Sequence, residues 1–142
     1  MFKYVAYISE QSHRFSEKEI QELLEKSRSK NSTREITGLL IFLDGIFTQF
    51  IEGPAETVNE LYESISTDPR HKGLLELTSG ISDKRYYSDW TMAYRKLNHD
   101  DFVKITGYRE LDKSQFFSKS MHKVKHPGIQ LLQSFVSGLH FS

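Results

Sequence analysis

A glutamine in an otherwise apolar strand is the first residue of this sequence whose type and position could support chemistry. Gln49 shares one face of a predicted strand with Phe47 and Ile51. Its amide brings two donors and one acceptor into an apolar layer, which costs roughly 1–3 kcal/mol if the group stays unpaired. Tyr7 can satisfy it, because the strand order deduced below makes the two strands neighbours. The residues alone leave two interpretations open, a hydrogen bond that only fixes strand register and a working polar pair.

A second pair lies further along the chain. Trp90 and Met92 are two residues apart and therefore share one face of a predicted strand. Such a pair most often belongs to an apolar core. A buried indole N–H nevertheless needs an acceptor, which a neighbouring amide could provide.

The usual motifs of enzyme and metal sites are missing from the sequence. It contains no cysteine, no glycine-rich phosphate loop, no G-x-S-x-G and no H-E-x-x-H. His122 and His126 have the spacing of a metal pair, but Pro127 ends the helix there and no carboxylate follows. We therefore predict solvated surface histidines and no metal site.

Composition narrows the class of protein. The 142 residues are enough for one domain, and 19 Lys and Arg balance 19 Asp and Glu. This balance argues against direct binding to nucleic acid or to an anionic membrane by bulk attraction, and the stretch Lys26–Arg34 is expected to be a solvated helix end. No apolar run reaches the length of a membrane span, and the first residues do not resemble a signal peptide. We expect a cytoplasmic protein.

Periodicity and turn signals predict the elements that position these residues. Asp44-Gly45 predicts a type I′ hairpin in which Leu40 lies opposite Gln49, and Ser16 with Glu19 forms a capping box. The predicted elements are a strand over Phe2–Ser9, a helix from Ser16 to about Lys30, strands over Ile36–Leu43 and Ile46–Glu52, a helix from Pro54 to Asp68, and strands over Leu74–Ile81 and Tyr87–Tyr94. This order predicts an α+β fold, a ferredoxin-like βαββαββ sandwich whose first and third strands are central neighbours.

Residues 97–142 are predicted to form a C-terminal helical extension of the unit formed by residues 1–96. A short helix or turn is expected between Asn98 and Gly107, and another helix over Ser114–Lys123. A last helix is indicated by apolar residues at helical spacing, namely Ile129, Leu132, Val136 and Leu139. We expect these helices to cap the sheet face that the first two helices leave open. A partner-binding surface is the alternative.

Five motifs in order give the sequence a family resemblance over about its first 96 residues. They are Tyr7-Ile8-Ser9, Asn31 before Ile36-Thr37-Gly38-Leu39-Leu40, the stretch from Gly45 to Gly53 with Gln49 at its centre, Asp68-Pro69-Arg70-His71, and Ser88-Asp89-Trp90-Thr91-Met92. The chain resembles the BLUF domains, blue-light sensors that hold a flavin without a covalent bond. The resemblance implies that Tyr7 donates an electron and a proton to the photoexcited flavin. It also implies that Gln49 bridges Tyr7 and the N5/O4 edge of the ring and then rearranges its hydrogen bonds.

The resemblance assigns further cofactor contacts. Asn31 would bind the carbonyl and N3 edge of the ring, and Ile36 would pack on the ring between the two helices. Arg70 and His71 would lie towards the ribityl–phosphate end of the cofactor. Lys30 stands where some relatives have a second asparagine.

The signalling residues and the output also follow from the resemblance. Trp90 and Met92 would relay the change at Gln49. We therefore expect a blue-light photoreceptor and not an enzyme, with FAD as cofactor and FMN as the alternative. The chain leaves no room for an output domain of its own, so we expect a homo-oligomer that signals to a downstream protein effector.

Two competing hypotheses stay open at this point. Ferredoxin-like scaffolds also host acylphosphatases, and Arg34 with Asn31 could hold a phosphate, although no glycine loop accompanies them. The other competitor is a regulatory module that binds a different small ligand. A yellow preparation with a flavin spectrum separates the sensor from both.

Overall fold

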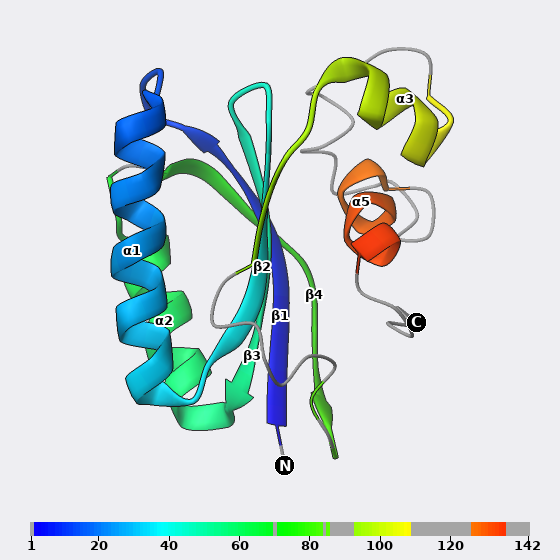
Figure 1. Cartoon of the computed structure of the whole chain (residues 1–142). Helices are drawn as coiled ribbons and strands as arrows, with labels where there is room; N and C mark the ends of the chain where they lie inside the picture. Colours follow the sequence, from blue (N-terminus) through cyan, green and yellow to red (C-terminus); the bar gives the residue numbers. More distant parts are fainter. Residues whose placement is uncertain (1, 70, 84, 86–92, 109–125, 136–142) are drawn as a thin grey trace.

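A five-stranded sheet separates two layers of helices (Figure 1). The computed structural model describes residues 2–69, 71–83, 85, 93–108 and 126–135. Its elements are β1 (Phe2–Gln11), α1 (Glu17–Arg34), β2 (Thr37–Leu43), β3 (Ile46–Pro54), α2 (Ala55–Ser66), β4 (His71–Ser82), β5 (Ala93–Lys96), α3 (His99–Thr106) and α5 (Pro127–Phe135). This arrangement confirms the predicted α+β, ferredoxin-like class.

The sheet has the strand order β4-β1-β3-β2-β5. The first four strands are antiparallel neighbours, and β5 adds to β2 in parallel. Asp44 and Gly45 join β2 to β3 with φ angles of 47° and 80°, the two positive values that a type I′ turn requires. The predicted hairpin, and the predicted contact between the first and third strands, are both confirmed.

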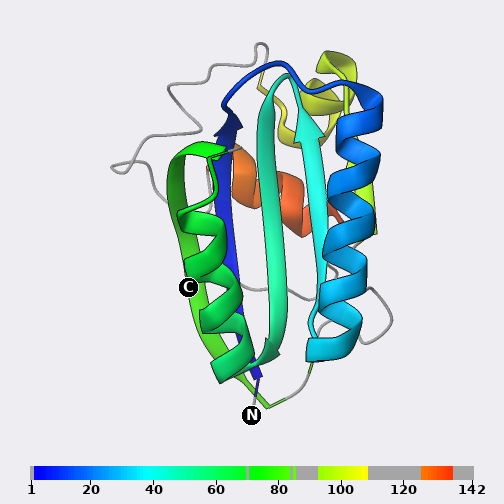
Figure 2. The same ribbon diagram turned by 90° about the vertical axis from the view of Figure 1, so that its left-hand side faces the viewer.

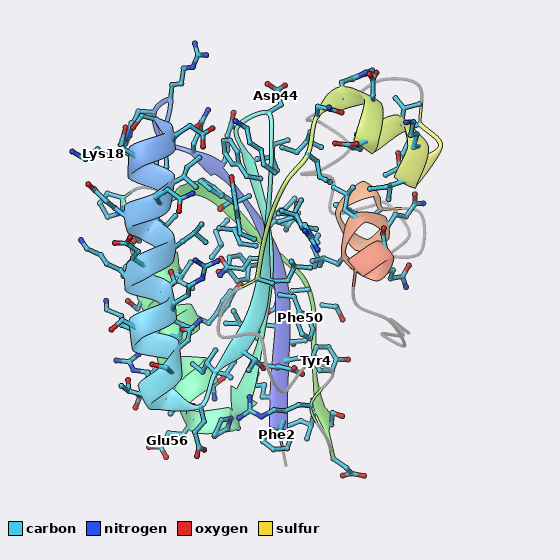
Figure 3. All side chains as sticks on the ribbon, viewed as in Figure 1. Phe2, Tyr4, Lys18, Asp44, Phe50 and Glu56 are labelled. Carbon is cyan, nitrogen blue, oxygen red and sulfur yellow. The ribbon has the colours of Figure 1, made fainter. Side chains whose placement is uncertain are left out.

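Each face of the sheet carries its own apolar core. Val5 and Tyr7 of β1 point to the layer of α1 and α2, whereas Ala6 and Ile8 point to the layer of α3 and α5. This follows from the period-two alternation of a strand. In Figure 3, Tyr4 and Phe50 lie on the α5 side, where their rings stack at 6.0 Å between centroids.

Helix α1 begins where the sequence predicts and ends later. The capping box is present, with Glu19 N–H donating to Ser16 Oγ at 3.1 Å and Ser16 N–H donating to Glu19 Oε1 at 3.1 Å. The predicted end near Lys30 is wrong, because the helix continues to Arg34 and closes with Glu35 in the left-handed conformation. A glycine usually takes that cap position, so the sequence carries no stop signal there.

The described helices of the C-terminal third, α3 and α5, pack on the second face of the sheet. Phe102 of α3 and Ile129 and Leu132 of α5 are completely buried against the strands. The other two members of the predicted stripe, Val136 and Leu139, lie outside the described residues. So do the predicted helix Ser114–Lys123 and residues 87–92 of the predicted fifth strand, of which Ala93 and Tyr94 lie in β5. No helix in the described ranges is long and apolar enough to cross a membrane.

His126 corrects one prediction. It is 3% exposed rather than solvated, and its Nδ1 accepts a hydrogen bond of 3.0 Å from the N–H of Gly128. Gly128 approaches β4 so closely that a Cβ there would lie 3.1 Å from Leu77 Cδ1. The side chain therefore caps the first turn of α5 and is buried by the docking of that helix on the sheet. His122 lies outside the described residues.

Candidate functional site

Tyr7 and Gln49 lie directly opposite each other on β1 and β3. The Tyr7 hydroxyl donates a hydrogen bond to Gln49 Oε1, and the two residues are 0% and 7% exposed. Leu40 of β2 is the partner of Gln49 on its other side, as the hairpin predicts. The pair is thus held within the sheet by neighbours on both sides.

Burial keeps the phenol of Tyr7 neutral. Removal from water raises the pKa of Tyr7 well above its ordinary value, and the nearby Tyr62, whose ring centroid is 5.4 Å away, raises it further. A neutral phenol keeps its proton, and Tyr7 donates this proton in the hydrogen bond to the Gln49 oxygen. The other polar group of Gln49 is its NH₂, which carries two donors.

A cleft between α1 and α2 reaches Gln49. Figure 2 shows β3 running in the gap between the two helices, which run in opposite directions across the sheet. The cleft is lined by Leu23, Lys26, Ser27, Lys30, Asn31, Leu40, Gln49, Leu61, Ser64, Ile65 and Asp68. Two amide side chains, Gln49 and the 1% exposed Asn31, therefore border the same hollow.

The sequence of the two helices explains why they leave this hollow. The inner face of α1 is apolar at Ile20, Leu23 and Leu24 but then carries the small or polar residues Ser27 and Asn31. On α2 only Val58 is fully buried, whereas Leu61 and Ile65 stay half-buried at the edge of the cleft. The second half of α1 thus supplies no large apolar side chain to meet them.

The residues around the cleft fit a flavin. Its walls offer apolar side chains, which suit a planar aromatic ring, and the buried amides offer the donors and acceptors that the N3–H and carbonyl edge of such a ring requires. The observation that carries this fit is the presence of two buried amides in one hollow with the apolar side chains of Leu23, Leu40, Leu61 and Ile65.

The structure brings together some of the predicted site residues. Asn31 and Gln49 line the cleft, and Tyr7 donates its hydrogen bond to Gln49. Ile36 is buried in the same apolar cluster as Tyr7, and its N–H donates to the Asn31 carbonyl at 3.0 Å. Ile36 lines a second hollow, beside the carboxyl end of α1, which shares Asn31 with the first. His71 begins β4. Arg70, Trp90 and Met92 lie outside the described residues.

Arg85 is a residue that the sequence analysis missed. Its guanidinium donates to the Glu35 carbonyl and, at 3.2 Å, to Thr37 Oγ1, the two neighbours of Ile36. The same group lies 4.7 Å from the centroid of the Phe2 ring. Arg85 thus ties the end of α1 to the start of β2. No local motif signals this role, since its partners are about 50 residues away in the chain.

Comparisons with known proteins identify the family of the chain. Residues 2–93 match the profile of the BLUF family, described as sensors of blue-light using FAD. The blue light- and temperature-regulated antirepressor BluF of Escherichia coli K12 is 34% identical over 70 residues, which are 49% of this chain and 17% of that protein. The photoactivated adenylate cyclase subunit beta of Euglena longa is 29% identical over 90 residues, 63% of this chain but only 10% of that protein.

One solved structure resembles nearly the whole chain. The dark-state structure of the BLUF protein BlrB has a TM-score of 0.70 and 25% identity, and the match covers 94% of this chain and 97% of that one. The matching fold, the Tyr7–Gln49 pair and the profile over residues 2–93 agree with one another. The chain belongs to the BLUF family of blue-light sensors that use FAD.

Proposed function

We propose that this chain is a blue-light photoreceptor in which Tyr7 and Gln49 form the photochemical pair. The observation that carries the proposal is the buried hydrogen bond from the Tyr7 hydroxyl to Gln49 Oε1 at the floor of the cleft between α1 and α2. The cofactor is FAD, and FMN fits the same ring-binding residues.

A flavin bound in the cleft absorbs blue light and supplies an excited electron acceptor. Tyr7 donates the electron, because it is the buried phenol beside the cleft amide. Its proton leaves along the existing hydrogen bond towards the Gln49 oxygen. The raised pKa of Tyr7 ensures that this proton is present before illumination.

Gln49 converts the proton movement into a lasting change. Its amide oxygen accepts from Tyr7 in the structure. Once the electron has returned and Tyr7 has regained a proton, only the amide would be left in another tautomer or orientation. The donor and acceptor that it presents to the cleft would then be exchanged. A changed hydrogen bond from Gln49 to the ring carbonyl of a bound flavin would shift its absorption modestly to the red. Such a rearrangement is worth roughly 1 kcal/mol, enough to bias a bistable element.

The other predicted residues complete the binding site in this proposal. Asn31 binds the carbonyl and N3 edge of the ring, and its burial at the cleft supports this role. Ile36 packs at the ring end of the site, while Arg70 and His71 lie towards the ribityl–phosphate end.

Signalling leaves the site through the strands next to Gln49. Leu40 lies between Gln49 and Tyr94 in one row across β3, β2 and β5. β5 in turn contacts α1 through the ion pair between Lys96 and Glu17. We propose that Trp90 and Met92, which precede β5 in the chain, relay the change along this route.

The output in this proposal is a protein–protein contact. Residues 1–96 form the photosensory unit and residues 97–142 its helical cap. The chain catalyses no reaction of its own. It acts in the cytoplasm as a homo-oligomer on a downstream protein, without binding nucleic acid directly.

Absorption spectroscopy of the purified chain tests the proposed function. We expect a yellow protein whose flavin spectrum shifts reversibly to the red under blue light and recovers in the dark. Chromatography of the released cofactor identifies FAD or FMN. A colourless protein that binds no added flavin would contradict the proposal.

A further inference from the structure

Two lysines stand at the mouth of the cleft. Lys26 and Lys30 are one helical turn apart on α1, and both line the hollow between α1 and α2. Both side chains are exposed, whereas Gln49 and Asn31 at the floor are buried. Figure 3 shows Lys18, on the same helix, pointing away from the sheet.

The charge around this mouth is positive. Of the residues that line the cleft, Lys26 and Lys30 are cationic and Asp68 is anionic. Neither lysine forms an ion pair within the described part of the chain. Lys26 and Lys30 are like charges at i, i+4 spacing, which disfavours this turn of the helix, while Glu22 stands one turn before Lys26 as an opposite charge. An anionic ligand at the cleft would offset this repulsion.

The phosphate of a bound FMN or FAD would lie at this mouth. The proposed function puts the neutral ring at the buried amides, so the chain attached to the ring leaves through the solvent-exposed opening. FMN and FAD carry phosphate on this chain, and riboflavin carries none. Resting on that proposed function, in which Arg70 and His71 lie towards the same end of the cofactor, we propose that Lys26 and Lys30 add contacts to its phosphate. These contacts would make the cleft select phosphorylated flavins over riboflavin.

Flavin titrations test this selectivity. Riboflavin, FMN and FAD are titrated into the chain after release of its cofactor, and the dissociation constants are measured by equilibrium dialysis at low and high salt. The variants are the double substitution Lys26→Gln with Lys30→Gln and the control Lys18→Gln. Two partly exposed charge contacts predict that the native chain binds FMN and FAD about tenfold more tightly than riboflavin at low salt. High salt should reduce the difference.

The double variant should lose most of this preference and bind riboflavin with an affinity within about twofold of the native value. Lys18→Gln should keep the native preference. Equal affinity of the native chain for all three flavins would overturn the inference, and so would a preference that survives in the double variant. An equal loss of riboflavin affinity in the double variant would also overturn it, because the lysines would then act on the ring or the fold. If no flavin binds the native chain, the proposed function itself fails.

Discussion

The Tyr7 hydroxyl donates its hydrogen bond to Gln49 Oε1 across two strands that are both in the interior of the sheet. β1 lies between β4 and β3, and β3 lies between β1 and β2. Backbone ladders therefore hold both residues from two sides, and the geometry of the pair does not depend on flexible loops. A change in the hydrogen bonds of this amide therefore acts directly on neighbouring residues that are held in a defined register.

The buried phenol predicts a specific dependence of stability on pH. Burial raises the pKa of Tyr7 in the folded state, whereas the unfolded state titrates near pH 10. Below that pH the residue is neutral in both states and its contribution is constant. Above it the unfolded chain releases a proton that the folded chain keeps, so the free energy of unfolding should fall as pH rises.

Urea unfolding between pH 8 and pH 11 measures this effect, with Tyr7→Phe as the comparison. The free energy of unfolding should fall less steeply with pH above about pH 10 in the variant, since one tyrosine with a raised pKa has been removed. Tyr62 and Tyr94 also have raised pKa values and should maintain part of the slope. Identical slopes in both proteins would show that Tyr7 does not titrate as the structure implies.

Arg85 is predicted to stabilise the turn beside the site. Arg85→Gln removes charge-assisted hydrogen bonds to the Glu35 carbonyl and to Thr37 Oγ1. The free energy of unfolding should fall by about 1–3 kcal/mol. Arg14→Gln, at an exposed arginine, is the control and should change it by less than about 0.5 kcal/mol. If both variants unfold at the same urea concentration, Arg85 does not hold this turn.

A substitution on the sheet face away from the cleft should lower the stability of the fold without changing flavin binding. Leu132 of α5 is completely buried on the face away from the cleft. Leu132→Ala should lower the free energy of unfolding by about 2–5 kcal/mol. The flavin spectrum and affinity of the folded variant should stay native. Ser134→Ala, at an exposed position of the same helix, is the control. Loss of flavin from folded Leu132→Ala would show that the C-terminal layer shapes the cleft.

Local signals in the sequence predict the strand geometry of the site, whereas the roles of Tyr7 and Gln49 and the cofactor contacts of Asn31 and Ile36 followed only from the family resemblance. Alternation assigns Tyr7 and Gln49 each to one face of its own strand, and the Asp44-Gly45 turn fixes the register that places Leu40 beside Gln49. Each of these signals lies within a few residues of the position that it determines.

The predictions from the sequence are wrong or incomplete where tertiary packing determines the burial or the partners of a residue. His126 is buried by the docking of α5 on β4, which its neighbours in the sequence do not reveal. Arg85 reaches partners about 50 residues away, beyond any periodic pattern. The end of α1 depends on a left-handed Glu35 rather than on a glycine.

The proposed roles of Tyr7 and Gln49 predict the behaviour of three substitutions. Gln49→Leu removes the amide that can exchange a donor for an acceptor, and Tyr7→Phe removes the electron and proton donor. Both should still bind flavin, because the loss of one hydrogen bond of about 1 kcal/mol leaves the other residues that line the cleft in place. Gln21→Leu replaces a glutamine with leucine at an exposed position of α1 and serves as the control.

Absorption spectra before and after blue illumination, recorded for the native chain and these variants, test the central claim most directly. The native chain and Gln21→Leu should show a reversible red shift of the flavin band, and Gln49→Leu and Tyr7→Phe should show none. A reversible red shift of native size in flavin-loaded Gln49→Leu would contradict the assignment of the signal to this amide.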